Sequence, residues 1–595
     1  MRRETPGLGP FLSQLEARLE DMTAERLRGA LVAHATRLPA AERTAFLAIF
    51  DPPTAPRDTK KQADPGDPTL LDDIDAFLAD IDDGVYVEGF GYDPDYGDHR
   101  TFGDETWTVE MRDLLERAGL AFLAGGIGQA REAYRRLLEA LRPEYDEGGF
   151  PGAGTPEDVL GGVDEAKHRY LRAVWEAEPV ATRAAAVVEA AEDLDDVGDE
   201  LSLAALEATR REPLPDLDAV LPDLIAQLQT VDHGRYGFGA EARRALAEAT
   251  ERHRGVDGFA DLACIPGPNQ AEAYRDWADG LARVGRLTDA EQAARQALER
   301  LEAHGRVQAT LAQRLAALAA ARGDGPALLE ARQAAWRAEP TLTRLLNLID
   351  VATALDCRDK VVAAEADRSA AAPLAERPPL AASVLLLAGR VGEAIGLLDG
   401  PDALSWGQGY SPGPVIVPFL LVGGSDAISD PQWNDLLLFD LLDGANAAGW
   451  PHPGYGASES LDAVPEPWRS ADDASERFRA FPRDDLLLSA LLVDALDQHP
   501  FDPNERRQWL DAARRYVEAR VHDVVSGQHR GAYQQAAHLA AAYAEAIALT
   551  SGGRTAREFI DSLHARYPRH SAFRRELRPA VASSPLLNAT ESRRR

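Results

Sequence analysis

The chain has 595 residues and carries 98 acidic against 64 basic side chains, for a formal net charge of −34. Such an acidic surface repels phosphate, which excludes broad binding to nucleic acids and anionic membranes. The length exceeds what one hydrophobic core supports, so several domains or one extended array are expected. With 45% hydrophobic, 27% charged and only 7% aromatic residues, the composition is that of a globular and mainly helical protein.

The chain offers little that would bind a metal or cross a membrane. Two cysteines, Cys264 and Cys357, cannot build a disulfide framework or a four-cysteine zinc site, and no cofactor is expected. No basic and apolar leader follows Met1, and the richest apolar run, residues 415–422, is short and contains Pro418. These features predict a cytoplasmic protein. Four Lys against sixty Arg are typical of a GC-rich bacterial genome, with a halophile as the alternative.

Before the repeats the sequence changes character three times. Residues 1–50 are predicted to form an N-terminal helical segment, because apolar residues recur at helical spacing. Residues 51–69 are rich in Pro, Asp and Lys and are predicted to be a linker. Residues 70–107 hold a short acidic helix, over 70–81, followed by an aromatic and Gly-rich loop. We expect this loop to be ordered, with a short hairpin near residues 86–92.

A pattern of paired helices recurs along the middle of the chain. A helix of small and apolar residues, a Gly turn and a second helix with Ala at fixed offsets occur at residues 118–138 and 278–301, with looser copies at 316–340 and 385–398. Small side chains let the paired helices approach closely, and Gly supplies the turn. Such hairpins cannot bury their apolar faces alone, so they stack into a superhelix.

The best copy shows which family the pattern resembles. Its marker positions are Ala278, Leu281, Gly285, Leu287, Ala290, Ala294 and Ala297. This spacing resembles the tetratricopeptide repeat, although the next Gly turn, at Gly323, follows after 38 residues instead of 34. The resemblance implies an all-α fold, an α-solenoid of repeat-like hairpins over residues 108–400. It also implies a concave surface that grips a peptide or a protein.

The repeats are followed by a change in composition. Residues 401–460 are predicted to be an irregular segment with one helix, over 431–442, between two Gly- and Pro-rich stretches. We consider two arrangements. In one, this segment interrupts the array and divides it into two lobes; in the other, the array is continuous. Residues 461–581 are predicted to form a C-terminal helical region, and the Ser- and Arg-rich residues 582–595 a disordered tail.

The C-terminal helical region resembles a second family in a few positions. These lie in residues 533–539 and 559–563 and at Tyr567, Phe573 and Leu577, and they are similar to the helical part of bacterial SWIM-type zinc-finger proteins. The Cys and His motif that holds zinc in that family is absent. The resemblance therefore implies a shared scaffold and no zinc site.

Catalytic motifs are missing from the sequence. The Gly pairs, such as Gly125 and Gly126, lack the Lys and the Ser or Thr of a Walker loop. No His pair has the HExxH spacing, and no Ser has the flanking Gly residues of a nucleophile elbow. The carboxylates near residues 93–98 do not match an EF-hand loop, because Asp98 stands where Gly is required.

Three groups of residues remain as candidates for binding a partner. They are Tyr92, Tyr96, His99 and Trp107 in the aromatic loop, Trp450 and His452 in a rigid turn, and Arg569, Arg574 and Arg575 in a basic C-terminal hairpin. Aromatic side chains and Arg forks are typical of protein and anion contacts. For each group, structural packing or a solvated face is the alternative interpretation.

The sequence thus favours a non-enzymatic scaffold or adaptor that binds a protein or peptide, with a basic partner favoured by the net charge. One alternative is a helical enzyme or accessory subunit with its site in the irregular loops, at 406–456 or 85–107, because such loops often carry function. Another is an anion or nucleic-acid contact through the basic C-terminal hairpin. The oligomeric state and the identity of the partner are not predicted.

Overall fold

The computed structural model describes residues 67–588 with internal gaps. The gaps are residues 94–97, 104–105, 143–159, 161, 199, 232–237, 302–304, 372–373, 401–402, 406–409, 426, 428–434, 448–464, 466–467, 469–485 and 499–501. The predicted N-terminal helical segment and nearly all of the predicted linker lie outside the described residues, as does the last part of the predicted tail.

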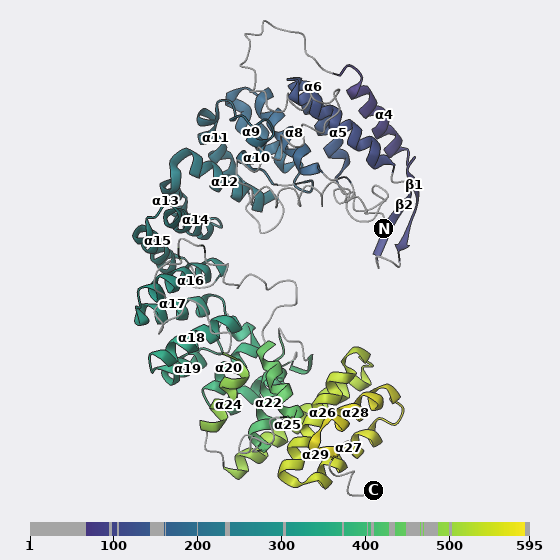
Figure 1. Ribbon diagram of the computed structural model, residues 1–595, viewed down its shortest axis with the longest axis vertical. Coiled ribbons are helices and arrows are strands. Elements are labelled where there is room, and N and C mark those ends of the chain that lie inside the picture. Colours follow the sequence, from purple (N-terminus) through teal and green to yellow (C-terminus); the bar gives the residue numbers. More distant parts are fainter. Residues whose placement is uncertain are drawn as a thin grey trace, which may run out of the picture.

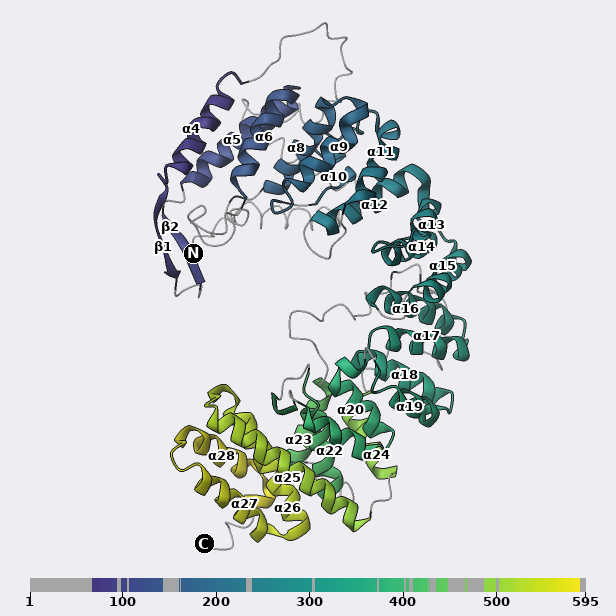
Figure 2. The ribbon, with the colours of Figure 1, turned by 180° about the vertical axis from the view of Figure 1, so that it is seen from behind.

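The described residues form an open arc of packed helices (Figures 1 and 2), with the first helices at one end and the last helices at the other. The predicted all-α helical-repeat fold is confirmed. In the described part of the chain the strands are limited to one two-stranded ribbon. Also within that part, none of the helices combines the length and the apolar character needed to cross a bilayer.

We divide the arc into three parts by chain order. The N-terminal arm contains α4 (Leu70–Asp82), β1 (Val87–Asp93), β2 (Asp98–Gly103), α5 (Trp107–Leu123), α6 (Ile127–Ala140), α8 (Val163–Ala177), α9 (Val180–Glu192), α10 (Leu203–Ala208), α11 (Leu217–Thr230) and α12 (Phe238–Arg254). The middle array contains α13 (Gly258–Ala263), α14 (Gln270–Arg283), α15 (Leu287–Arg300), α16 (Arg306–Ala321), α17 (Gly325–Ala338), α18 (Leu342–Ala354) and α19 (Arg358–Asp367). The C-terminal body contains α20 (Pro378–Leu387), α21 (Val391–Gly396), α22 (Gly413–Ser425), α23 (Leu437–Asp443), α24 (Leu488–Gln498), α25 (Pro503–Ser526), α26 (Tyr533–Ser551), α27 (Gly553–Arg566), α28 (Ser571–Ser583) and α29 (Pro585–Asn588).

The four predicted hairpins are present as α5–α6, α14–α15, α16–α17 and α20–α21. Each turn has a glycine with positive φ; at Gly285 φ is 81°. This left-handed residue lets the next backbone N–H, that of Arg286, donate to the carbonyl of Leu281 at 2.9 Å. The helix therefore ends in a Schellman motif, which satisfies its last carbonyls and reverses the chain within a few residues.

A fifth hairpin, α18–α19, uses the same turn without a glycine. Asp356 takes the left-handed position with φ 56°, and the N–H of Cys357 donates to the carbonyl of Ala352 at 2.9 Å. Asp356 lies 33 residues after Gly323 and 33 residues before Gly389. The array thus has a regular period here, which the sequence hides because Asp replaces Gly at one turn.

The described residues bury their apolar side chains in three clusters. The first runs from Leu70 to Ala249 and lies in the N-terminal arm. The second runs from Ala263 to Val351 in the middle array and includes Trp468. The third runs from Trp336 to Leu587, so the last repeats and the C-terminal body share one core across the predicted boundary at residue 400.

The segment predicted to be irregular, residues 401–460, contains a buried helix that the sequence does not reveal. All residues of α22 are buried, including Pro418, and the helix packs against α20, α23, α25 and α26. Because α22 is apolar on every side, it shows no helical periodicity. A Cβ on Gly423 would lie 2.7 Å from Cζ3 of Trp509, so the glycine serves close packing instead of a break. The described helix that follows, α23, begins at Leu437 instead of residue 431.

Two boundaries at the ends of the predicted regions also differ. The aromatic loop contains an antiparallel ribbon, β1 and β2, which is longer than the predicted hairpin. The chain expected to be a disordered tail from residue 582 is helical to Asn588, because Ser584 accepts a hydrogen bond from the N–H of Leu587 and Pro585 begins α29. The side chain of Leu587 is buried in the C-terminal core.

Candidate protein-binding surface

In the middle array, the helices of each hairpin lie on opposite sides of the arc, one inner and one outer. In Figures 1 and 2, α14 and α16 lie toward the inside of the arc, and α15 and α17 lie toward the outside. The inner helices also contact each other directly, so α14 and α16 form neighbouring walls. Side chains from successive hairpins therefore meet on the inner side.

A tryptophan from a distant part of the sequence is buried against these two helices. Trp468 is 0% exposed and belongs to the apolar cluster of the middle array. Its indole N–H donates a hydrogen bond of 2.8 Å to Oδ1 of Asp279 on α14. Its backbone N–H donates to the carbonyl of Pro465 at 2.9 Å, which forms a turn just before the ring. The contact joins positions 189 residues apart.

The carboxylate that receives the indole is itself held in place. Arg314 on α16 donates from Nη2 to Oδ2 of Asp279 at 2.7 Å, and also from Nε to Oδ1. The Arg314 side chain is only 6% exposed and also donates to the carbonyl of Thr310. A forked guanidinium fixes both the position and the plane of a carboxylate. We refer to Trp468, Asp279 and Arg314 as the Trp468 site.

Asp279 is the last of three acidic residues on one face of α14. Glu272, Asp276 and Asp279 are spaced by four and three residues, so they form a row, which we call the inner acidic row. Arg275 donates to Asp276 at 2.7 Å and also pairs with Glu272. Burial raises the pKa of Asp276, and hydrogen bonding and charge from Arg275 oppose this effect. The row is about 10 Å long, at 1.5 Å per residue.

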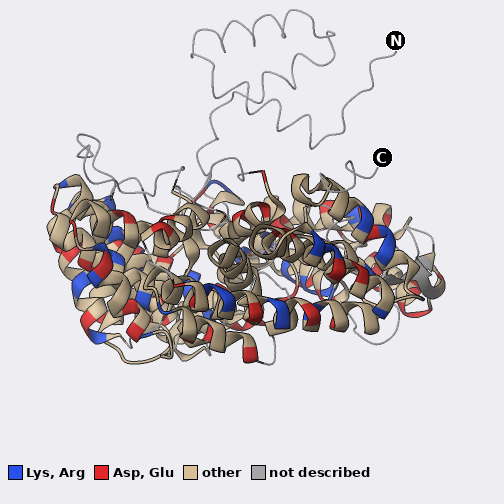
Figure 3. Ribbon diagram, turned by 90° about the horizontal axis from the view of Figure 1, so that it is seen from below, with Lys and Arg blue, Asp and Glu red and all other residues tan. Residues whose placement is uncertain are grey.

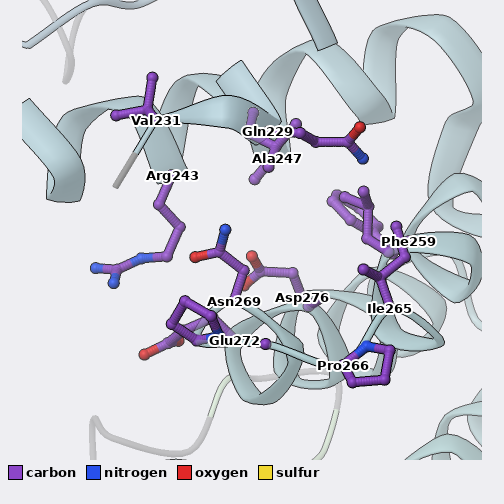
Figure 4. Close-up of a pocket in the computed structure, with 15 residues that line it drawn as sticks. Gln229, Val231, Arg243, Ala247, Phe259, Ile265, Pro266, Asn269, Glu272 and Asp276 are labelled. Carbon is purple, nitrogen blue, oxygen red and sulfur yellow. The ribbon is translucent and has the colours of Figure 1, made fainter. Parts of the chain in front are cut away.

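The first two acids of this row also line a cavity of about 250 Å³, shown in Figure 4. We call it the elbow pocket, because it lies at the seam between the first two apolar clusters. Its lining residues come from α11, α12, α13, the loop after α13 and α14, and they are Gln229, Val231, Arg243, Leu246, Ala247, Phe259, Leu262, Ile265, Pro266, Gly267, Pro268, Asn269, Glu272, Ala273 and Asp276. Oδ1 of Asn269 is buried there and has no hydrogen-bond partner among the described residues. The pocket combines a mostly apolar wall with a few polar groups, which is typical of ligand sites.

Charges elsewhere are spread over the whole arc. Acidic and basic positions are interspersed along the ribbons in the view of Figure 3. Many arginines pair within their own helix, as Arg135 does with Glu132 and Glu139. In the described part of the chain, no group of three or more His, Cys, Asp or Glu side chains has the geometry to hold a metal ion.

The aromatic candidates from the sequence do not gather into one site that the structure describes. Tyr92 and His99 are directly paired in the β1–β2 ribbon, but their side chains lie outside the described residues. Tyr96, Trp450 and His452 also lie outside the described residues. Trp107 is 1% exposed and packs in the N-terminal core at the start of α5. Its ring therefore fills the core instead of facing a partner.

The basic candidates lie at the end of the C-terminal body. Arg569 is exposed in the turn before α28, Arg574 is half-buried on α28, and the side chain of Arg575 is 79% exposed beside Glu576. The pKa of His564 is lowered by burial and by the nearby charges of Arg574 and Arg578. These residues remain a candidate anion contact.

The residues of the Trp468 site were not predicted from the sequence. Trp468 lies in a segment without helical periodicity, and Asp279 and Arg314 look like ordinary charged positions on amphipathic helices. The one available signal was the position of Asp279 next to Ala278, the first small residue of the clearest repeat. No spacing rule connects these residues to Trp468, because the contact is made only by folding.

Comparisons with known proteins add no family to this description. No protein-family model matches the chain. No curated protein matches it either. Neither the resemblance to the tetratricopeptide repeat nor that to SWIM-type zinc-finger proteins is supported by these comparisons, and the helical-repeat architecture is what the structure itself provides.

Proposed function

We propose that this protein is a non-enzymatic scaffold that binds a protein or peptide on the inner surface of its helical arc. The observation that carries the proposal is the Trp468 site. There, two inner helices bury the side chain of Trp468, which comes from a distant segment. The indole N–H donates a hydrogen bond to the Asp279 carboxylate, which Arg314 orients. The contact supports the proposal because it shows that the inner helices can hold an indole from a segment distant in sequence.

The chemistry of the site suits recognition of another chain. A buried Trp with a hydrogen-bonded N–H is typical of binding hot spots, because it combines a large apolar area with one directional contact. The net charge of −34 favours a partner with basic residues. The elbow pocket offers a second place for a side chain on the same helix, α14.

The test is cross-linking of the full-length protein in its native cells. A carboxylate-reactive cross-linker is suitable, since the chain has 98 acidic residues. We expect at least one partner to be enriched, with cross-links that map to α14 or α16. The double variant Asp279→Asn, Arg314→Gln should lose this partner, because the carboxylate anchor is removed.

The matched control is Asp289→Asn on the outer helix α15, where the aspartate is half-exposed and pairs with Arg286. This variant should retain the partner. The proposal is wrong if no protein is enriched, or if the enriched proteins are the same for the double variant and the wild type.

A further inference from the structure

We propose that the elbow pocket binds a free apolar α-amino acid, of the size of leucine or phenylalanine, through both of its charged groups. This site goes beyond the proposed function, because it takes a small molecule and uses residues other than those of the Trp468 site. The ligand is identified by its chemistry: a carboxylate, an ammonium group and an apolar side chain carried by one carbon atom.

The elbow pocket has an apolar end and a polar end. In the view of Figure 4, the side chains of Phe259 and Ile265 lie on one side of the cavity, and those of Arg243 and Asn269 lie on the other. Phe259 is buried, whereas Ile265 is 53% exposed. A ligand that covers Ile265 removes apolar surface from water, which favours an apolar group at this end.

The volume of the pocket limits the size of the ligand. The cavity measures about 250 Å³. A closed apolar cavity of about 150 Å³ holds one benzene ring. The difference leaves room for a head group of a few heavy atoms beside a ring or a branched chain, and an apolar amino acid has these proportions.

Arg243 provides a positive charge that is not used within the described part of the protein. It is half-buried on α12, and among the described residues it has no hydrogen-bond or ion-pair partner. The two carboxylates that line the pocket, those of Glu272 and Asp276, are instead paired with Arg275. A guanidinium binds a carboxylate through two parallel hydrogen bonds, so Arg243 suits the carboxylate of the ligand.

Asn269 provides a hydrogen-bond acceptor that is likewise unused. It is the N-cap residue of α14, where an Asn side chain usually accepts from the first N–H groups of the helix. Here the side chain makes no capping bond, and Oδ1 is buried without a hydrogen-bond partner among the described residues. A buried acceptor without a donor costs free energy, which an ammonium group of the ligand would recover. The Asp276 carboxylate lines the same pocket and attracts this positive charge.

The two groups have opposite requirements, and together they select a ligand with both charges. A simple carboxylic acid would pair with Arg243 but leave Oδ1 of Asn269 without a donor. A simple amine would donate to Asn269 but leave Arg243 without an anion. An apolar amino acid meets both requirements and covers the apolar end with its side chain.

Isothermal titration calorimetry of the full-length protein tests the inference, with L-leucine and L-phenylalanine as probes. The controls for the tighter probe each lack one charge: isocaproate and isoamylamine for leucine, or hydrocinnamate and phenethylamine for phenylalanine. We expect the amino acid to bind at least tenfold more tightly than either control. It should also bind at least tenfold more tightly than L-alanine, which leaves the apolar end of the pocket uncovered.

Two variants assign the charges of the ligand to residues. Arg243→Gln should weaken binding of the amino acid at least tenfold, to the level of the amine, and Asn269→Ala should weaken it to the level of the acid. The matched control is Arg244→Gln, since Arg244 is exposed on the same helix and pairs with Glu200 outside the pocket. It should leave binding unchanged, and helical circular dichroism should be the same for all three variants.

A further arm separates a free amino acid from the end of a protein chain. The N-acetyl derivative of the tighter probe copies a C-terminal residue, because it keeps the carboxylate and loses the ammonium charge. It should bind at least tenfold more weakly than the amino acid. Equal or tighter binding of the derivative would overturn the inference and assign the pocket to a chain end.

The inference is also overturned if neither amino acid binds the wild type, or if a control with one charge binds as tightly. The same holds if Arg244→Gln weakens binding as much as Arg243→Gln does. None of these outcomes bears on the proposed function, whose test is the capture of a protein through Asp279 and Arg314.

Discussion

The middle array and the C-terminal body are both helical, but they are stabilised by different kinds of contact. In the middle array, α14 to α17 pack in sequence, each on the next, with α14 also touching α16. In the C-terminal body, α22 is surrounded by α20, α23, α25 and α26, which come from positions far apart in the chain. An array is stabilised by near-neighbour interfaces, whereas the body depends on one shared core. The difference bears on where a partner could bind, because α14 and α16 of the array lie toward the inside of the arc, whereas α22 at the centre of the body is buried on every side.

The largest effect should follow from opening the core of the C-terminal body. Phe419 on α22 is buried, and its ring centroid lies 5.7 Å from that of Trp509. We expect Phe419→Ala to lower the stability of the body by about 3–5 kcal/mol, because a buried aromatic ring is replaced by a cavity. Hydrogen exchange resolved by region should show faster exchange throughout α22, α25 and α26, with little change in α14 and α15.

The control for this core substitution is Leu487→Ala, since Leu487, just before α24, is 44% exposed. That change should stay within about 0.5 kcal/mol. If Phe419→Ala accelerates exchange equally in α14 and α15 and in the body, the middle array and the body share one cooperative unit and the comparison fails.

A second large effect concerns a buried carboxyl group that joins two helices of the body. Glu545 on α26 is 0% exposed and accepts a hydrogen bond from the N–H of Leu438 at the start of α23. Burial raises its pKa to about 7, against the lowering effect of hydrogen bonds from Ser584 and from the α23 backbone. The folded protein therefore holds this proton more tightly than the unfolded chain does.

The sign of the pH dependence follows from that raised pKa. The stabilisation linked to this proton is complete below pH 4.5, the ordinary value for Glu, and is lost as the pH rises through about 7. Glu545→Gln stays neutral at every pH and keeps an acceptor oxygen. The difference in unfolding free energy between this variant and the wild type should therefore shift in favour of the variant by roughly 3 kcal/mol as the pH rises from 4.5 to above 7. Denaturant unfolding of both proteins from pH 4.5 to 8 measures this difference. Parallel curves would show that Glu545 does not titrate in this range.

An intermediate effect separates the two kinds of turn in the middle array. Gly285 has φ 81° and open space around the position of a Cβ, so Gly285→Ala meets only backbone strain. We expect a loss of about 1 kcal/mol. Asp356 has a similar φ of 56° in the α18–α19 turn. Asp356→Gly should therefore stabilise the array, by less than about 1 kcal/mol.

The opposite signs of these two substitutions are the useful result. Thermal unfolding, followed by helical circular dichroism, measures both. If Asp356→Gly destabilises the protein, the aspartate side chain contributes something to the turn that a left-handed backbone alone does not, and the two turns are not equivalent.

A feature of this fold could be predicted from the sequence when the residues that define it lie close together in the chain. The hairpin at Gly285 was predictable because turn and helix spacing lie within one short window. The hairpin at Asp356 was missed because a residue other than Gly takes the same backbone angles. Helix α22 was missed because burial on all sides removes periodicity. The contact between Trp468 and Asp279 was beyond any local pattern, since only the folded arc brings these residues together.

The smallest expected effect contrasts a partly exposed carboxylate of the C-terminal body, that of Glu518, with the buried Glu545. Glu518 on α25 accepts a hydrogen bond from Nε of Arg514 at 2.8 Å, one helical turn away, and the Arg514 side chain is 57% exposed. Water screens such a pair and both side chains lose freedom in making it, so Glu518→Gln should change stability by less than about 0.5 kcal/mol. Denaturant unfolding at low and high salt is the measurement. Glu518 and Glu545 differ mainly in their access to solvent. A larger loss of stability in Glu518→Gln would therefore mean that surface ion pairs, as well as the shared core around α22, stabilise the body.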